Sequence, residues 1–100
     1  MKTYKSVVLN IAKDDVKEAY KWYDKQLKGL GKRFVDDMKT TLSDVANNPT
    51  SFAIRRQNLR LANFKTFPYA AHFFINTEDD TVFIIAILHT KRNPNTSLNR

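Results

Sequence analysis

The residues best suited to chemistry lie where the last apolar run of the chain ends. That run closes on His89, and Lys91 and Arg92 follow it directly. A histidine here could move a proton as a general acid or base, and Arg92 could hold a phosphate through two hydrogen bonds. Each has a structural alternative. His89 could cap the strand through a backbone hydrogen bond, and Arg92 could pair with a carboxylate of its own chain. A partner's carboxylate, held by Arg92 in the same geometry as a phosphate, would be a functional contact.

A second group of cations comes earlier, in a stretch without acids. The segment from Val45 to Thr77 has no acidic residue. Its basic residues are Arg55, Arg56, Arg60 and Lys65. Alternation along a strand puts Arg60 on the pleat face opposite Leu59 and Leu61, and we expect this to be the face that helices do not cover. These cations then form a basic surface, which either binds a target or only keeps the protein soluble.

Composition limits the classes of function. The chain has 17 Lys and Arg against 10 Asp and Glu, a net charge of +7, which favours a polyanion or an acidic protein as partner. It has no cysteine and only two histidines, so we expect no metal site, and no cofactor is indicated. No run approaches the roughly 20 apolar residues of a membrane span, and no apolar signal segment follows Met1. We therefore expect a cytoplasmic protein without a membrane partner.

Two long apolar runs provide the framework for these residues. Residues 67–75 and 81–89 are apolar on both pleat faces and are separated by the short polar segment 76–80, which predicts an antiparallel hairpin at the centre of a sheet. His72 on the first run is expected to be partly buried and hydrogen-bonded. Tyr69 either packs in the core or is exposed, where it could stack on a base or contact a peptide.

The rest of the chain predicts one strand, two helices and two short strands. We expect a strand over 4–9, a helix from an Asn10 N-cap to about Lys28, and a second helix from Leu30 until Asn48-Pro49 stops it. Residues 52–56 and 59–64 are short strands around a tight turn. The predicted fold is α+β, a single domain over 1–100: an N-terminal strand and a two-helix hairpin packed on one face of a mainly antiparallel sheet of four to five strands. Trp22 lies off the apolar stripe and is a candidate for a partner contact.

The order of several short motifs resembles that of the RelE/ParE superfamily of toxins from type II toxin-antitoxin modules, often named plasmid stabilisation proteins. The motifs are Gly29-Leu-Gly31 with Phe34, Asn48-Pro49, Phe67-Pro-Tyr69 and His89-x-x-Arg92-x-Pro94. The resemblance covers nearly the whole chain. It implies a bacterial growth inhibitor that is neutralised by a cognate antitoxin with an extended, often acidic segment. Arg55, Arg56, Lys65, Tyr69 and Lys91 would then bind the target or the antitoxin.

The same resemblance leaves two targets open. RelE-like toxins cut mRNA on the ribosome without a metal; here Arg60 and Arg92 would stabilise the phosphate and His89 would move the proton. ParE-like toxins inhibit DNA gyrase. Tyr69 stands where RelE-like members commonly have arginine. The ending His89-x-x-Arg92-x-Pro94 is more usual among the ParE-like members and those without an assigned target, although Leu98 stands where an aromatic residue is often found. A third possibility is a non-toxic basic domain that binds nucleic acid in a salt-dependent manner.

Overall fold

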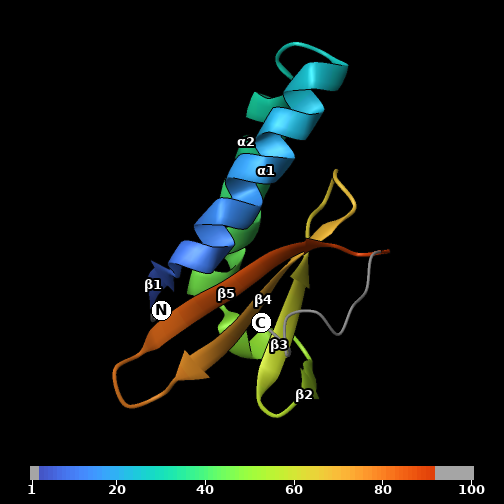
Figure 1. Cartoon of the computed structure of the whole chain (residues 1–100). Helices are drawn as coiled ribbons and strands as arrows, with labels where there is room; N and C mark the ends of the chain where they lie inside the picture. Colours follow the sequence, from blue (N-terminus) through green and yellow to red (C-terminus); the bar gives the residue numbers. More distant parts are fainter. Residues whose placement is uncertain (1–2, 92–100) are drawn as a thin grey trace.

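The computed structural model describes residues 3–91, which form an α+β fold with two helices on one face of a five-stranded sheet (Figure 1). The elements are β1 (Lys5–Val8), α1 (Asn10–Gln26), α2 (Leu30–Asn47), the short 3-10 helix η1 (Pro49–Ser51), β2 (Ile54–Arg56), β3 (Leu59–Asn63), β4 (Tyr69–Asn76) and β5 (Thr81–His89). The predicted fold class is thereby confirmed. Within the described residues, no helix is long and apolar enough to cross a bilayer.

The sheet has the strand order β1-β5-β4-β3-β2. Neighbouring strands are antiparallel except that β1 runs parallel to β5. The two doubly apolar runs therefore occupy central positions, as their composition predicts. β1 is short and pairs only with residues 81–84, so it covers only the first part of the β5 edge.

Local expectations hold at the turns and fail at one helix cap. Gln57 and Asn58 have φ values of 50° and 68°, which confirms the tight turn between β2 and β3. The predicted N-cap at Asn10 is wrong: Leu9 takes that position and makes no side-chain cap, and Asn10 is the first helical residue. The short strand predicted over 52–56 begins only at Ile54, because η1 precedes it.

The two glycines of the chain organise the junction of the helices. Gly29 has a φ of +92°, a left-handed conformation that reverses the chain just before α2. The Asp24 carboxylate accepts hydrogen bonds from the backbone N–H groups of Gly29 and Gly31, at 3.0 and 3.1 Å. These N–H groups lie at the helix start, so Asp24 satisfies donors that have no partner within α2.

Gly31 also allows the helices to approach closely, which predicts a measurable cost for Gly31→Ala. A Cβ atom there would lie 2.8 Å from the Tyr20 carbonyl oxygen and 2.9 Å from its ring. Because the oxygen belongs to the backbone, the helices must separate, and we expect a loss of about 1–3 kcal/mol in the free energy of unfolding. Urea denaturation measures it. Lys32→Ala, at an exposed neighbouring position, is the control; equal losses for the two variants would contradict the close-approach explanation.

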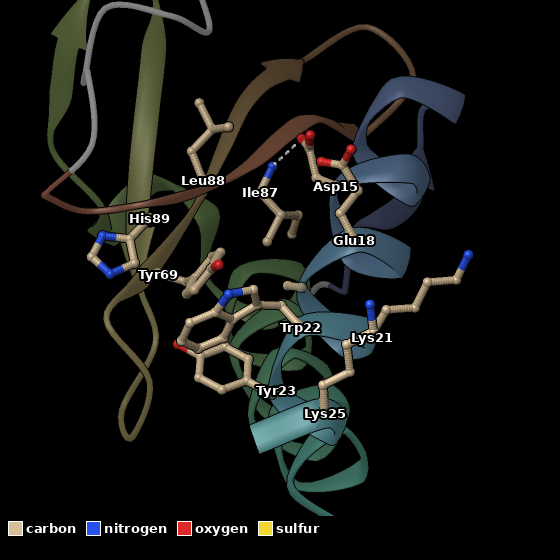
Figure 2. A pocket seen from close by; sticks show the side chains of 11 residues that line it. Asp15, Glu18, Lys21, Trp22, Tyr23, Lys25, Tyr69, Ile87, Leu88 and His89 are labelled. Atoms are coloured by element: carbon tan, nitrogen blue, oxygen red, sulfur yellow. Dashed lines mark hydrogen bonds between the residues drawn. The ribbon is translucent and has the colours of Figure 1, made fainter. Parts of the chain in front are cut away.

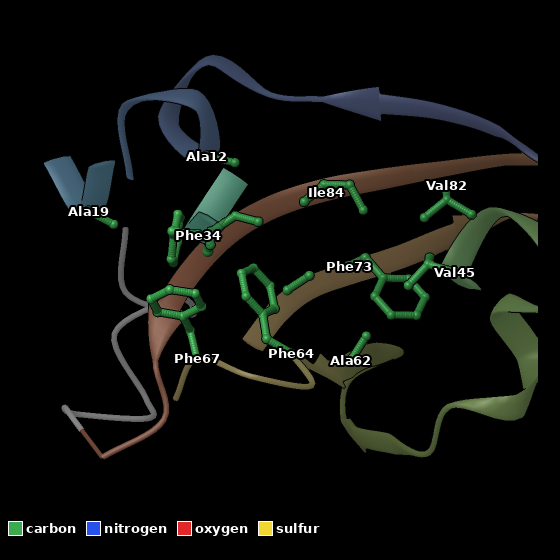
Figure 3. Close-up of a cluster of buried hydrophobic side chains, with 12 residues drawn as sticks. Ala12, Ala19, Phe34, Val45, Ala62, Phe64, Phe67, Phe73, Val82 and Ile84 are labelled. Atoms are coloured by element: carbon green, nitrogen blue, oxygen red, sulfur yellow. The ribbon is translucent and has the colours of Figure 1, made fainter. Parts of the chain in front are cut away.

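The core lies between the helices and one face of the sheet (Figure 3). Phe34 of α2 is fully buried at its centre. From the sheet side, Ala62, Ala71 and Phe73 pack into the same cluster. Side chains alternate along a strand, so Phe74 points to the opposite face, where its ring stacks on Phe83 at 5.4 Å.

Candidate functional site

A groove of about 680 Å³ lies between α1 and the second half of β5 (Figure 2). Its lining residues are Asp15, Glu18, Ala19, Lys21, Trp22, Tyr23 and Lys25 from α1, Tyr69 from β4, and Ile87, Leu88 and His89 from β5. Aromatic side chains gather at one end, whereas Asp15 and Glu18 lie at the other end beside Ile87. A smaller hollow, of about 370 Å³, lies beside α2 and includes Asp37 and Phe67 in its lining.

The groove exists because β1 ends before β5 does. The Leu9 N–H donates to the Ile84 carbonyl at 3.0 Å, and from there the chain turns away into α1. Beyond this point α1, not a strand, lies beside the β5 edge. The Asp15 carboxylate accepts a hydrogen bond from the Ile87 N–H at 3.0 Å, and the small side chain of Ala19 leaves space next to it.

Trp22 is the most exposed large hydrophobic side chain of this groove, with 52% of its surface accessible. Its ring meets the Tyr23 ring edge-on at a centroid distance of 5.0 Å. The Tyr23 ring in turn packs on Phe67 at 4.8 Å, which connects it to the core. An exposed tryptophan held by a rigid aromatic support is typical of the anchor residues of protein interfaces.

Tyr69 and His89 meet at the aromatic end of the groove. They face each other across β4 and β5, with ring centroids 5.3 Å apart. Tyr69 also packs on Phe34 at 4.9 Å, so it is half-buried on the helix side of the sheet. The His89 Nδ1 atom accepts a hydrogen bond from the Lys91 N–H at 3.1 Å. The structure therefore shows His89 in a backbone hydrogen bond at the end of its strand, as its structural alternative predicts.

The expectation that Arg60 lies on the uncovered sheet face is wrong. Arg60 pairs with Phe73, and residues directly opposite each other in an antiparallel pair share a face. Phe73 belongs to the core under the helices, so Arg60 lies at the margin of that same face. Its guanidinium donates to the carbonyl oxygens of Phe52 and Thr50.

The predicted basic residues are distributed over distant parts of the fold. Arg55 and Arg56 are exposed on β2, the sheet edge farthest from β1. Lys65 follows β3 and pairs with Asp44 of α2 at 3.5 Å. Lys91 is exposed next to the groove, and Arg92 lies outside the described residues. Of the predicted site residues, the structure thus brings together Tyr69, His89 and Lys91.

The sheet face opposite the helices is apolar along its centre. Leu61, His72 and Ala86 are neighbours across three strands of this face. His72 is 3% exposed, so it is buried more deeply than the partial burial that the sequence predicts. Over residues 3–91, no group of three or more His, Cys, Asp or Glu side chains could hold a metal ion.

Several groove residues were absent from the sequence-based candidates: Asp15, Glu18, Lys21, Lys25 and Ile87. The sequence contained one signal for the α1 side of the groove: Trp22 is an apolar residue that lies outside the apolar stripe of its helix. Asp15, Glu18 and Trp22 follow one another at spacings of three and four, which places them on one side of α1. That side faces the groove.

Comparison with known proteins agrees with the fold. Residues 8–94 match the family described as the ParE toxin of the type II toxin-antitoxin system parDE. The fold is similar to a structure of the chromosomal ParDE system from P. aeruginosa, with a TM-score of 0.77 and 14% identity over 89% of this chain and 98% of that one. It is also similar to the RelBE2 toxin-antitoxin complex from Mycobacterium tuberculosis, with a TM-score of 0.66 and 19% identity over 89% of this chain and 93% of that one. No curated protein sequence matches it.

Proposed function

Because the chain belongs to the ParE toxin family of type II toxin-antitoxin systems, we propose that it arrests growth by binding DNA gyrase and that it does not cut RNA. The toxin role follows from the family. The choice of gyrase rests mainly on one observation, the separation of Arg60 from His89. Gyrase works in the cytoplasm, where we place the toxin.

The separation follows from the strand register. Arg60 is opposite Phe73 and His89 is opposite Tyr69, so the two lie four positions apart along β4 and on different neighbouring strands. At about 3.3 Å per residue this amounts to roughly 13 Å along the strand alone. A proton-transfer group must be within hydrogen-bond reach of the phosphate that the cation stabilises. The carbonyl contacts of Arg60 also give its guanidinium a structural role.

Two alternative functions can be tested by the same experiments. An mRNA endoribonuclease could rely on His89 and Arg92, without Arg60. A non-toxic nucleic-acid-binding domain would use the net charge of +7 and lose affinity steeply as salt rises.

We further propose that the antitoxin binds along the groove between α1 and β5. The exposed Trp22 and the apolar wall beside it favour a protein segment as the occupant. The net charge of +7 attracts an acidic antitoxin over long range. Within the groove, Asp15 and Glu18 repel acidic side chains, so contacts there should be apolar or neutral.

Induced expression in bacteria tests the gyrase proposal. We expect the wild-type chain and His89→Ala, Arg92→Ala and the double variant all to stop growth, with DNA damage and altered supercoiling, because gyrase inhibition needs no proton transfer. The purified wild-type protein should block supercoiling by gyrase at concentrations that leave ribosome-bound mRNA intact. Cleaved messages that disappear in His89→Ala would instead establish the nuclease. No growth arrest, together with salt-dependent binding to RNA or DNA, would establish the non-toxic alternative.

A further inference from the structure

The end of the helix hairpin carries a concentration of positive charge. Residues 25–33 run from the last turn of α1 through the Gly29 turn into the first turn of α2, and we call this segment the hairpin tip. It contains no acid and four basic residues: Lys25, Lys28, Lys32 and Arg33. The tip therefore carries a charge of +4, compared with +7 for the whole chain. In Figure 1 this end of the two helices extends away from the sheet.

The four cations of the tip are accessible to an external anion. All four residues are exposed. Three of them form no ion pair with another residue in the range 3–91. The fourth, Lys32, pairs with Asp36 at 3.1 Å, but its side chain is 78% exposed. An exposed pair of this kind contributes little stability, so Lys32 can exchange Asp36 for another anion.

The tip also departs from the charge preference of helix ends. The N-terminal end of a helix is the positive end of its dipole, so acids are favourable in the first turn and cations are unfavourable there. The first turn of α2 has no acid and carries Lys32 and Arg33. The carboxylate of Asp24, just before the tip, binds the N–H groups of Gly29 and Gly31. An anion bound at the tip would therefore relieve an unfavourable concentration of charge, and such local departures are expected at functional sites.

The arrangement of these cations suits a polymer of phosphates. Lys25 belongs to α1, Lys28 to the turn, and Lys32 and Arg33 to α2, so the tip can contact several phosphates at once. Double-stranded DNA presents one negative charge per roughly 1.7 Å of its axis. An anionic membrane fits less well, because interfacial helices bury a broad apolar face. Among the exposed large apolar side chains of the described residues, the tip contributes only Leu27.

We propose that the hairpin tip binds the phosphate backbone of double-stranded DNA while the toxin is bound to gyrase. The inference rests on the proposed function, because gyrase holds a DNA duplex when it works. The contact is independent of base sequence, since phosphate contacts carry no sequence information. It makes the toxin bind the gyrase–DNA complex more tightly than gyrase alone, and this preference weakens as salt rises.

Two matched variants test the tip on DNA without gyrase. The tip variant replaces three cations that do not line the groove: Lys28→Gln, Lys32→Gln and Arg33→Gln. The control variant makes the same change at three exposed lysines outside the tip: Lys5→Gln, Lys13→Gln and Lys39→Gln. Both variants lose three charges, and circular dichroism checks that both are folded. Fluorescence anisotropy measures their binding to a short duplex between about 50 and 200 mM salt.

The expected difference lies in the dependence of DNA affinity on salt. Loss of three phosphate contacts lowers the slope of log affinity against log salt by about two to three in the tip variant, and the control variant changes it by less than about one. Equal affinities and slopes for the two variants would overturn the proposal. It would also be overturned if the tip bound vesicles of anionic phospholipid and not the duplex.

A second measurement tests the contact on gyrase itself. Toxin binding is compared between gyrase alone and gyrase with bound DNA. We expect the wild type and the control variant to bind the DNA complex about tenfold more tightly, and the tip variant to bind both forms equally. Failure of the wild type to bind gyrase would refute the proposed target. Binding of the tip variant with an undiminished preference for the DNA complex would refute the tip contact and leave the gyrase target in place.

Discussion

Replacing Phe34 by alanine is expected to lower the free energy of unfolding by about 3–5 kcal/mol. Phe34 has none of its surface accessible. Its ring packs against four other aromatic rings, those of Tyr23, Phe64, Phe67 and Tyr69. These rings belong to α1, β4 and the segment between β3 and β4, so the cavity would weaken the joint between the helices and the sheet. Urea denaturation followed by circular dichroism measures the change.

Phe74→Ala is the matched control for this cavity. Phe74 lies on the opposite sheet face, is 38% exposed and contacts one ring, that of Phe83. We expect it to cost about 1 kcal/mol. If the two variants lost the same stability, the apolar face opposite the helices would contribute as much as the core, and the assignment of the core to the helix side would be wrong.

Much of the fold is predictable because local pattern and burial agree. β4 and β5 are apolar on both faces, and the structure places both inside the sheet. Gly29 and the Asn48-Pro49 pair mark the ends of α2 as expected. The parallel pairing of β1 with β5 was not predictable, because choosing a partner strand depends on packing between residues about 75 positions apart.

Arg60 shows that the alternation of side chains along a strand does not by itself tell which sheet face the helices cover. The expectation assumed that Leu59 and Leu61 face the helices because they are apolar. In this sheet both faces are apolar, and these leucines lie on the face away from the helices, together with His72. Polarity cannot assign a strand's faces when both are buried, so the position of Arg60 required the register.

The groove was not predictable from the sequence, although one of its residues gave a signal. Its position depends on where β1 stops pairing and on how α1 crosses the sheet, and neither is encoded in a local motif. Trp22 was identified as a contact candidate because it interrupts the polar side of α1. The structure places it on the groove beside Tyr69 and His89. The predicted groove residues are Trp22 of α1 together with Tyr69 and His89 of the sheet, and most of the residues that the prediction missed belong to α1.

The second large effect is expected from Asp37→Ala, which should lower the free energy of unfolding by about 2–4 kcal/mol. Asp37 is 9% exposed, and its carboxylate accepts hydrogen bonds from three consecutive backbone N–H groups, those of residues 65, 66 and 67, at 3.3, 2.9 and 2.8 Å. These donors lie on the segment that connects β3 with β4 and carries the buried Phe67. Without the carboxylate, the donors are left without an acceptor close to the core. Urea denaturation and amide hydrogen exchange at residues 65–67 measure the effect.

Asp37→Asn and Asp36→Ala separate the reasons for this loss. The amide oxygen of asparagine can keep the bonds to residues 66 and 67 but turns an N–H₂ group toward residue 65, so we expect an intermediate loss of about 1–2 kcal/mol. Asp36 is exposed and pairs with Lys32 in an i,i+4 contact, so its removal should change stability by less than about 0.5 kcal/mol. If Asp36→Ala and Asp37→Ala were equally costly, the effect would come from the charge of α2. A selective loss at Asp37, with faster exchange at residues 65–67, would establish the carboxylate as the contact that holds the β3–β4 connection, and through it Tyr69, against the helices.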